Sequence, residues 1–76
     1  MKELLETIAR SLVDYPDEVR VNEVDSENTI ILELSVAKED MGKVIGKQGR
    51  IAKAIRTVIK AAAIKENVRV AVEIVQ

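Results

Sequence analysis

The chain has 76 residues, a formal net charge of −1, and neither cysteine nor histidine. This length suits one domain with a modest core. The missing residue types exclude disulfides, cysteine-ligated zinc and the usual histidine general base. No apolar stretch approaches the roughly 20 residues that span a bilayer. We therefore expect a single cytoplasmic domain over residues 1–76, without membrane contact, metal or cofactor.

The first half of the chain predicts one helix and two strands. Apolar residues at helical spacing predict a helix over 2–13, which ends before Pro16 because proline disfavours helix at the preceding residue. Residues 18–24 are typical of a short strand and residues 25–28 of a turn. The clearest strand covers residues 29–36, where apolar and polar side chains alternate.

The second half predicts two helices, over 38–45 and 50–64, separated by a glycine loop, and a final strand over 68–75. The element order is therefore α-β-β-α-α-β. The first two strands can pair antiparallel as a hairpin, and the third returns through a crossover long enough for parallel pairing. We expect an α+β fold, a three-stranded mixed sheet with all three helices on one face.

Charge is distributed very unevenly along the chain. Residues 1–40 carry eleven acids and four bases, whereas residues 41–65 carry seven bases and no acid. Such a basic stripe on an acidic body favours binding of a polyanion at one face. The alternative is an ordinary solvated helix face. The seven basic residues are Lys43, Lys47, Arg50, Lys53, Arg56, Lys60 and Lys65.

The loop Gly46-Lys47-Gln48-Gly49 lies within this basic stretch. Two glycines three residues apart permit a tight turn and leave no side chain to block a ligand. The start of a helix also presents free N–H groups and the positive end of the dipole, so the loop suits a phosphodiester backbone. A nucleotide-binding P-loop over Gly42 to Lys47 is excluded for two reasons. Only three residues, rather than four, separate Gly42 from Gly46, and the residue after the lysine is Gln48 rather than Ser or Thr. A dinucleotide fingerprint fails for lack of three correctly spaced glycines and of a βαβ unit.

The run Val44-Ile45-Gly46-Lys47-Gln48-Gly49, between two helices of an α-β-β-α-α-β chain, resembles the KH domain in its type II arrangement. The resemblance covers the whole chain, and it is greatest to the small single-domain bacterial KH RNA-binding proteins. The usual KH pattern has a large aliphatic residue where this chain has Ala52, although Ile51 and Ile55 flank that position.

This resemblance implies a non-catalytic RNA-binding protein, of the RNA chaperone or regulator type, whose GXXG loop holds the backbone of about four single-stranded nucleotides. Single-stranded DNA stays open as an alternative ligand. Sequence specificity should be low, because the single aromatic residue, Tyr15, lies far from the loop along the chain. The expected RNA-binding residues are Gly46, Lys47, Gln48, Gly49, Arg50, Lys43 and Lys53, with Val44 and Ile45 as an apolar floor.

The helix over 50–64 carries more apolar surface than one core-facing stripe requires. The surplus indicates either a dimer surface or simply the high helix propensity of alanine. The family resemblance implies a homodimer, or a heterodimer with a larger multidomain KH RNA-binding protein. A protein-interaction subunit with a vestigial loop is the alternative function.

An enzyme is disfavoured, because the remaining carboxylates at helix ends and turns should be solvated: Asp14, Asp17, Glu39 and Asp40.

Overall fold

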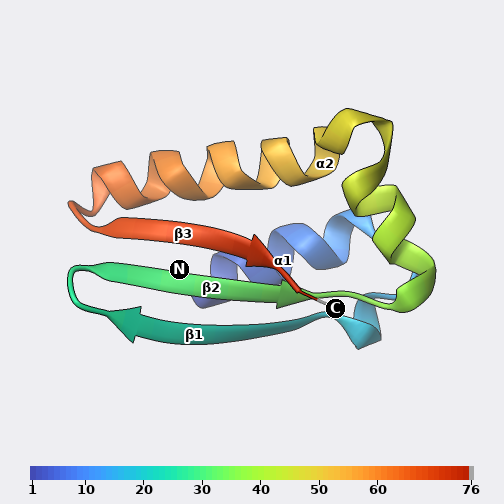
Figure 1. The fold of residues 1–76 in the computed structure, drawn as a ribbon, viewed down its shortest axis with the longest axis horizontal. Coiled ribbons are helices and arrows are strands. Elements are labelled where there is room, and N and C mark those ends of the chain that lie inside the picture. Colours follow the sequence, from blue (N-terminus) through green and yellow to red (C-terminus); the bar gives the residue numbers. More distant parts are fainter. Residues whose placement is uncertain (76) are drawn as a thin grey trace.

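The computed structural model describes residues 1–75, apart from the side chain of Lys47. Its elements are α1 (Lys2–Leu12), the 3-10 helix η1 (Pro16–Glu18), β1 (Arg20–Ser26), β2 (Thr29–Ser35), α2 (Lys38–Lys65) and β3 (Arg69–Ile74). The strands form one sheet in the order β1-β2-β3, with β1 antiparallel to β2 and β2 parallel to β3 (Figure 1). The predicted α+β fold with a mixed sheet is confirmed.

The hairpin between β1 and β2 is tighter than the sequence predicted. Ser26 pairs with Thr29, so only Glu27 and Asn28 form the loop. The predicted strand over 18–24 was therefore wrong at both ends. It starts later because η1 takes up the residues up to Glu18, and it ends later because cross-strand pairing continues to Ser26.

The core lies between the inner face of the sheet and the helices. Leu32 and Leu34 of β2 are completely buried, and Val72 of β3 and Val21 of β1 flank them in register. Helix α1 packs on β1 and α2 packs on β3, both against this inner face (Figure 1). Removing each such aliphatic side chain from water stabilises the fold by roughly 1.5–3 kcal/mol. The opposite face of the sheet carries the polar residues that the alternation predicted: Arg20, Asn22, Glu33, Arg69 and Glu73.

Helix α2 is divided into two arms by a sharp bend, which Figure 1 shows in yellow-green. Gln48 has φ 64° and Gly49 has φ 69°, the left-handed region that a right-handed helix does not use. We call residues 38–47 the first arm and residues 50–65 the second arm. The predicted four-residue loop is therefore narrower than expected: Gly46 stays helical, and only Gln48 and Gly49 reverse the chain.

The second arm ends in a hydrogen-bonded turn that leads directly into β3. The N–H of Val68 donates to the carbonyl of Ala63 at 2.9 Å, and the N–H of Asn67 donates to the carbonyl of Ile64 at 3.1 Å. This is the Schellman pattern, and Asn67 adopts the left-handed φ of 57° that it requires. The turn starts β3 beside β2, so the crossover ends in parallel pairing.

Candidate nucleic-acid interface

The two glycines of the bend have different structural roles. Gly49 needs its glycine, because a side chain at φ 69° is strained. Gly46 has no positive φ, and a Cβ on it would meet nothing within 4 Å beyond its own helix backbone and chain neighbours, among the described atoms. Glycine inside a helix costs about 0.5–1 kcal/mol relative to alanine. Packing among the described residues therefore does not explain why glycine stands at position 46.

Gln48 adds a second unusual feature to the bend. A non-glycine residue in the left-handed region costs roughly 1–2 kcal/mol, and such strain concentrates at functional sites. Its side chain is exposed, so burial of that side chain does not offset this cost. The bend is thus a locally unfavourable backbone that the rest of α2 holds in place.

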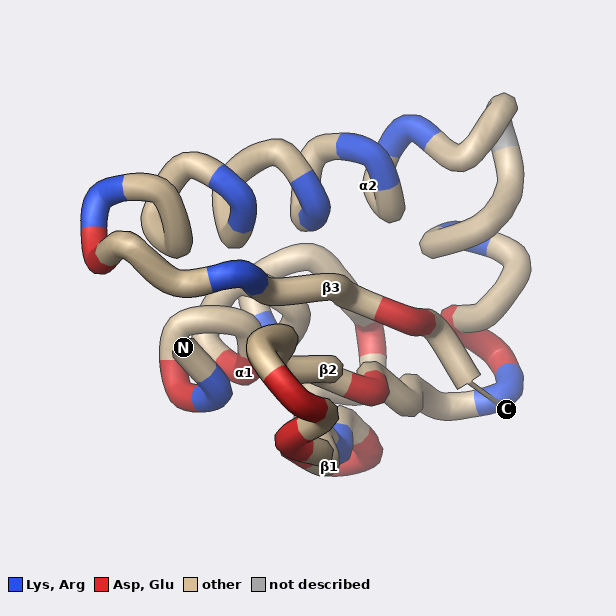
Figure 2. Tube along the Cα trace, turned by 60° about the vertical axis from the view of Figure 1, so that its left-hand side comes forward, with Lys and Arg blue, Asp and Glu red and all other residues tan. Residues whose placement is uncertain are grey.

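Basic side chains flank the bend on both arms. Figure 2 shows Lys and Arg at intervals along α2, whereas Asp and Glu lie mainly elsewhere, on β1 and its hairpin with β2, on β3 and in the first turn of α2. Lys43 on the first arm and Arg50 and Lys53 on the second are all exposed. The side chain of Lys47 lies outside the described residues, so its expected contact with phosphate stays a prediction. The charge asymmetry of the sequence therefore corresponds to separate regions of the folded molecule.

The apolar pair before the bend is divided between core and surface. Val44 is buried in the core, whereas Ile45 is 49% exposed. Neighbouring residues on a helix do not face the same way, so one packs inward and the other outward. Of these two residues, only Ile45 can present apolar surface to a ligand, whereas Val44 packs the first arm against the core. Ala52, at the position where the KH pattern differs, and the nearby Ile55 are both buried in the core.

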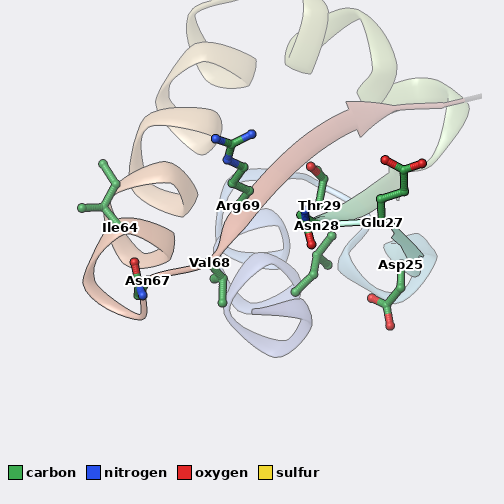
Figure 3. A pocket seen from close by; sticks show the side chains of 9 residues that line it. Asp25, Glu27, Asn28, Thr29, Ile64, Asn67, Val68 and Arg69 are labelled. Carbon is green, nitrogen blue, oxygen red and sulfur yellow. The ribbon is translucent and has the colours of Figure 1, made fainter.

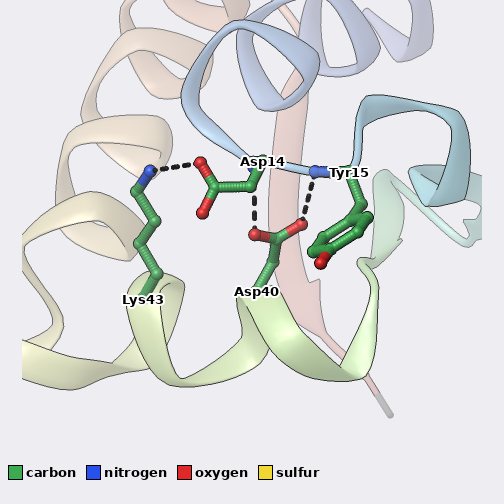
Figure 4. Close-up of polar contacts among 4 residues, drawn as sticks. All are labelled: Asp14, Tyr15, Asp40 and Lys43. Atoms are coloured by element: carbon green, nitrogen blue, oxygen red, sulfur yellow. Dashed lines mark hydrogen bonds and ion pairs between the residues drawn. The ribbon is translucent and has the colours of Figure 1, made fainter.

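A buried carboxylate ties the first arm to the segment after α1 (Figure 4). Asp40 is 1% exposed and accepts hydrogen bonds from the backbone N–H groups of Asp14 at 3.0 Å and Tyr15 at 2.9 Å. Beside it, Lys43 Nζ forms an ion pair with Asp14 Oδ1 at 3.3 Å. The expectation that Asp40 is solvated was wrong, because its two donors come from a distant segment and offset the cost of its burial. The side chain of Tyr15 is half-exposed.

A second long-range contact joins the second arm to the free edge of the sheet. Arg56 Nε donates a hydrogen bond of 3.3 Å to the carbonyl of Val72 on β3. Since β3 is an edge strand, this bond uses a carbonyl that has no strand partner on that side. The sequence identified Arg56 only as part of the basic stripe, and no local signal predicts its partner 16 residues away.

Other kinds of site find little support among the described residues. No three His, Cys, Asp or Glu side chains come together there as metal ligands. None of the described helices combines the length and the apolarity that crossing a bilayer requires.

The element order, the mixed sheet and the Gly-x-x-Gly bend between two helical arms together define a type II KH domain. The family model for the KH domain of KhpA and KhpB matches residues 2–74, so the chain belongs to this family. Its characterised members bind RNA and form a non-enzymatic class.

Several relatives match nearly the whole chain. RNA-binding protein KhpA of Clostridium acetobutylicum is 80% identical over 75 residues, which cover 99% of this chain and 100% of the relative. The protein of the same name from Caldanaerobacter subterraneus is 67% identical, with the same coverage. That from Chlamydia trachomatis is 54% identical over 76 residues, covering 100% of this chain and 97% of the relative.

Two solved structures of Era share the fold at low identity. Era of Aquifex aeolicus superimposes with a TM-score of 0.67 and 19% identity, covering 96% of this chain and 28% of that one. Era in complex with MgGDPNP and a segment of 16S ribosomal RNA superimposes with a TM-score of 0.63 and 19% identity, and the coverage is the same. At this identity the likeness concerns the fold alone.

Proposed function

We propose that this chain is a non-catalytic RNA-binding module that holds the backbone of short single-stranded RNA at the bend of α2. The observation that carries the proposal is Gly46, a helical glycine that packing does not require, next to the reversal at Gln48 and Gly49. The seven bases between residues 41 and 65, with no acid among them, supply the positive field. Close relatives that carry the name RNA-binding protein add independent support.

Each part of the proposed site has a physical task. Backbone N–H groups around Gly46 and Gly49 donate hydrogen bonds to phosphate oxygens, which the missing side chains allow to come close. Lys43, Arg50 and Lys53 neutralise neighbouring phosphates and release their counterions. Ile45 provides a small apolar surface for a base or ribose.

Sequence preference should be weak. Contacts to phosphate carry no sequence information, and the described residues place no aromatic side chain at the bend. Tyr15, the single aromatic residue, contacts the first turn of α2 through its backbone. The proposed activity is therefore that of a general RNA chaperone or regulator in the cytoplasm.

Self-association would strengthen such a weak single site. Ala54, Val58 and Ala61 lie on one face of the second arm, and all three are exposed, Val58 to 46%. We propose that this alanine-rich face joins two copies of the chain, or one copy and a larger KH protein. Two linked sites raise the apparent affinity through effective concentration, without new contacts to RNA.

The test is fluorescence anisotropy of a labelled single-stranded RNA pool with the wild type and with Gly46→Asp/Gly49→Asp. A side chain at Gly46 meets open space, whereas Asp at Gly49 adopts a strained positive φ that Asp tolerates better than most residues, so circular dichroism must first show that the variant is folded. We expect a loss of affinity of at least about tenfold, or ~1.4 kcal/mol. The control, Ser26→Asp/Asn28→Asp, adds the same charge at the hairpin and should bind within about twofold of the wild type.

Unchanged binding by the loop variant would refute the RNA site. The chain would then be better described as a protein-interaction subunit. Salt dependence provides a second check: three or four phosphate contacts predict a log–log slope of about −2 to −3, at ~0.7 per contact. Titration with DNA of the same sequence decides whether the ribose 2′-hydroxyl contributes.

A further inference from the structure

A pocket of about 790 Å³ lies at the end of the molecule where the β1–β2 hairpin meets the turn after α2 (Figure 3). This volume is within the range of sites that hold small ligands or a few side chains, about 300–1,000 Å³. The second arm of α2 separates the pocket from the bend. Its two walls are formed mainly by Asp25, Glu27 and Ile30 on the hairpin and by Ile64, Val68 and Arg69 on the other side.

One wall is apolar and exposed. Ile64 is 69% exposed, more than any other large hydrophobic residue described, and Val68 is 39% exposed. Across the pocket, Ile30 adds apolar surface on the hairpin side, from the inner face of β2. The turn that ends α2 holds the wall in position, since the carbonyl of Ile64 accepts a hydrogen bond from Asn67. Three aliphatic side chains therefore line the pocket, and at least two of them are exposed.

The other wall is acidic. Asp25 pairs in register with Ile30, and like Ile30 it points to the helix-covered face of the sheet, where apolar residues are usual. Among the described residues, neither Asp25 nor Glu27 has a cationic partner within 4.0 Å. The segment 21–37 contains four acids and no base. Arg69 is the one basic residue that lines the pocket, so its formal charge is −1.

We propose that this pocket docks a cationic, partly aliphatic peptide segment of a protein partner. A lysine or arginine of the segment pairs with Asp25 and Glu27, while a neighbouring aliphatic side chain packs on Ile64 and Val68. The two carboxylates disfavour a phosphate backbone here, in contrast to the bend. Because the two sites lie at different ends of the molecule, RNA and peptide can be bound at the same time. This inference goes beyond the proposed RNA binding and does not depend on it.

The experiment is an NMR titration of the ¹⁵N-labelled chain with a capped hexapeptide of alternating arginine and leucine. We expect saturable shifts of the backbone amides at residues 25–30 and 64–69. A peptide with glutamate in place of arginine, or serine in place of leucine, should bind at least about tenfold more weakly, since each removes one of the two kinds of contact.

Two pairs of variants make the test specific. Asp25→Lys/Glu27→Lys should lower peptide affinity at least tenfold, whereas Asp17→Lys/Glu18→Lys makes the same charge change at the other end of β1 and should stay within twofold. Ile64→Ser should weaken binding and Leu12→Ser on α1 should not, although both remove an exposed aliphatic residue from a helix.

Three results would overturn the proposal. In the first, the peptide shifts amides elsewhere and leaves those of the pocket unchanged. In the second, both charge-reversal variants weaken binding equally, which would indicate attraction to net charge alone. In the third, a single-stranded RNA oligonucleotide shifts the pocket amides, which would make the pocket a nucleic-acid site.

Discussion

Asp40 Oδ2 accepts a hydrogen bond of 2.9 Å from the backbone N–H of Tyr15, 25 residues earlier in the chain. With the second bond, from Asp14, it fastens the segment after α1 to the first turn of α2. The first arm leads from this attachment to the bend. The position of the proposed RNA site therefore depends on a carboxylate that does not touch RNA.

Replacing this carboxylate should destabilise the fold. Asp40→Ala leaves two backbone N–H groups without their acceptor in a part-buried site. We expect the free energy of unfolding to fall by about 2–3 kcal/mol. Urea denaturation followed by circular dichroism measures this. The exposed Asp17→Ala serves as a control and should change stability by less than about 0.5 kcal/mol. Equal effects of the two substitutions would contradict the attachment role of Asp40.

Gly46→Ala should separate stability from binding. Because Gly46 is helical and its Cβ direction is open, alanine should stabilise the fold by about 0.5–1 kcal/mol. The same methyl group lies where RNA backbone approaches, so affinity should fall about fivefold or more, ~1 kcal/mol. Denaturation and anisotropy measure the two effects on one sample.

Gly42→Ala is the matched control, one helical turn earlier, and its Cβ direction is also open. It should stabilise the protein to a similar extent and leave RNA affinity within about twofold. If Gly46→Ala bound RNA as well as the wild type does, the close approach of RNA to the first arm would be ruled out.

Asp14→Asn should increase RNA affinity. The Asp14 carboxylate pairs with Lys43 at 3.3 Å and both side chains reach solvent, so it competes with phosphate for the same ammonium group. Pairs of this kind contribute about 0.2–1 kcal/mol, which predicts an increase in RNA affinity of between about 1.4-fold and fivefold at low salt. The gain should shrink as salt screens the charges.

The control for this variant is Asp17→Asn, which changes the net charge equally but lies at a residue whose side chain has no described ion pair. It should increase affinity less than Asp14→Asn. Equal gains would show that net charge, rather than release of Lys43, determines the effect.

Val58→Glu should weaken the proposed self-association. A carboxylate on the alanine-rich face would have to lose its water on docking, and we expect the dimer dissociation constant to rise at least about tenfold. Analytical ultracentrifugation over a range of concentrations measures this. Lys60→Glu introduces a carboxylate on another face of the second arm and should leave the mass unchanged. A wild-type chain that stays monomeric at every concentration would refute the self-association.

Much of the fold followed from local patterns. Alternation along residues 29–36 correctly indicated that Leu32 and Leu34 face the core. The boundaries were less accurate, because pairing across the hairpin lengthened β1 to Ser26. For the bend, glycine spacing identified the region, but spacing alone did not reveal that Gln48, rather than Gly46, adopts the left-handed conformation.

The amino-acid sequence by itself determined the order of the elements, the separation of acidic from basic segments and the Gly-x-x-Gly class of the domain. These properties depend on residues close together in the chain, where periodicity and spacing carry the information. Only the tertiary structure decided that Asp40 is buried, that Ile45 rather than Val44 is exposed, and that Asp25 and Ile64 line one pocket. Each of these depends on groups brought together by packing from distant segments, and no local pattern encodes such partners.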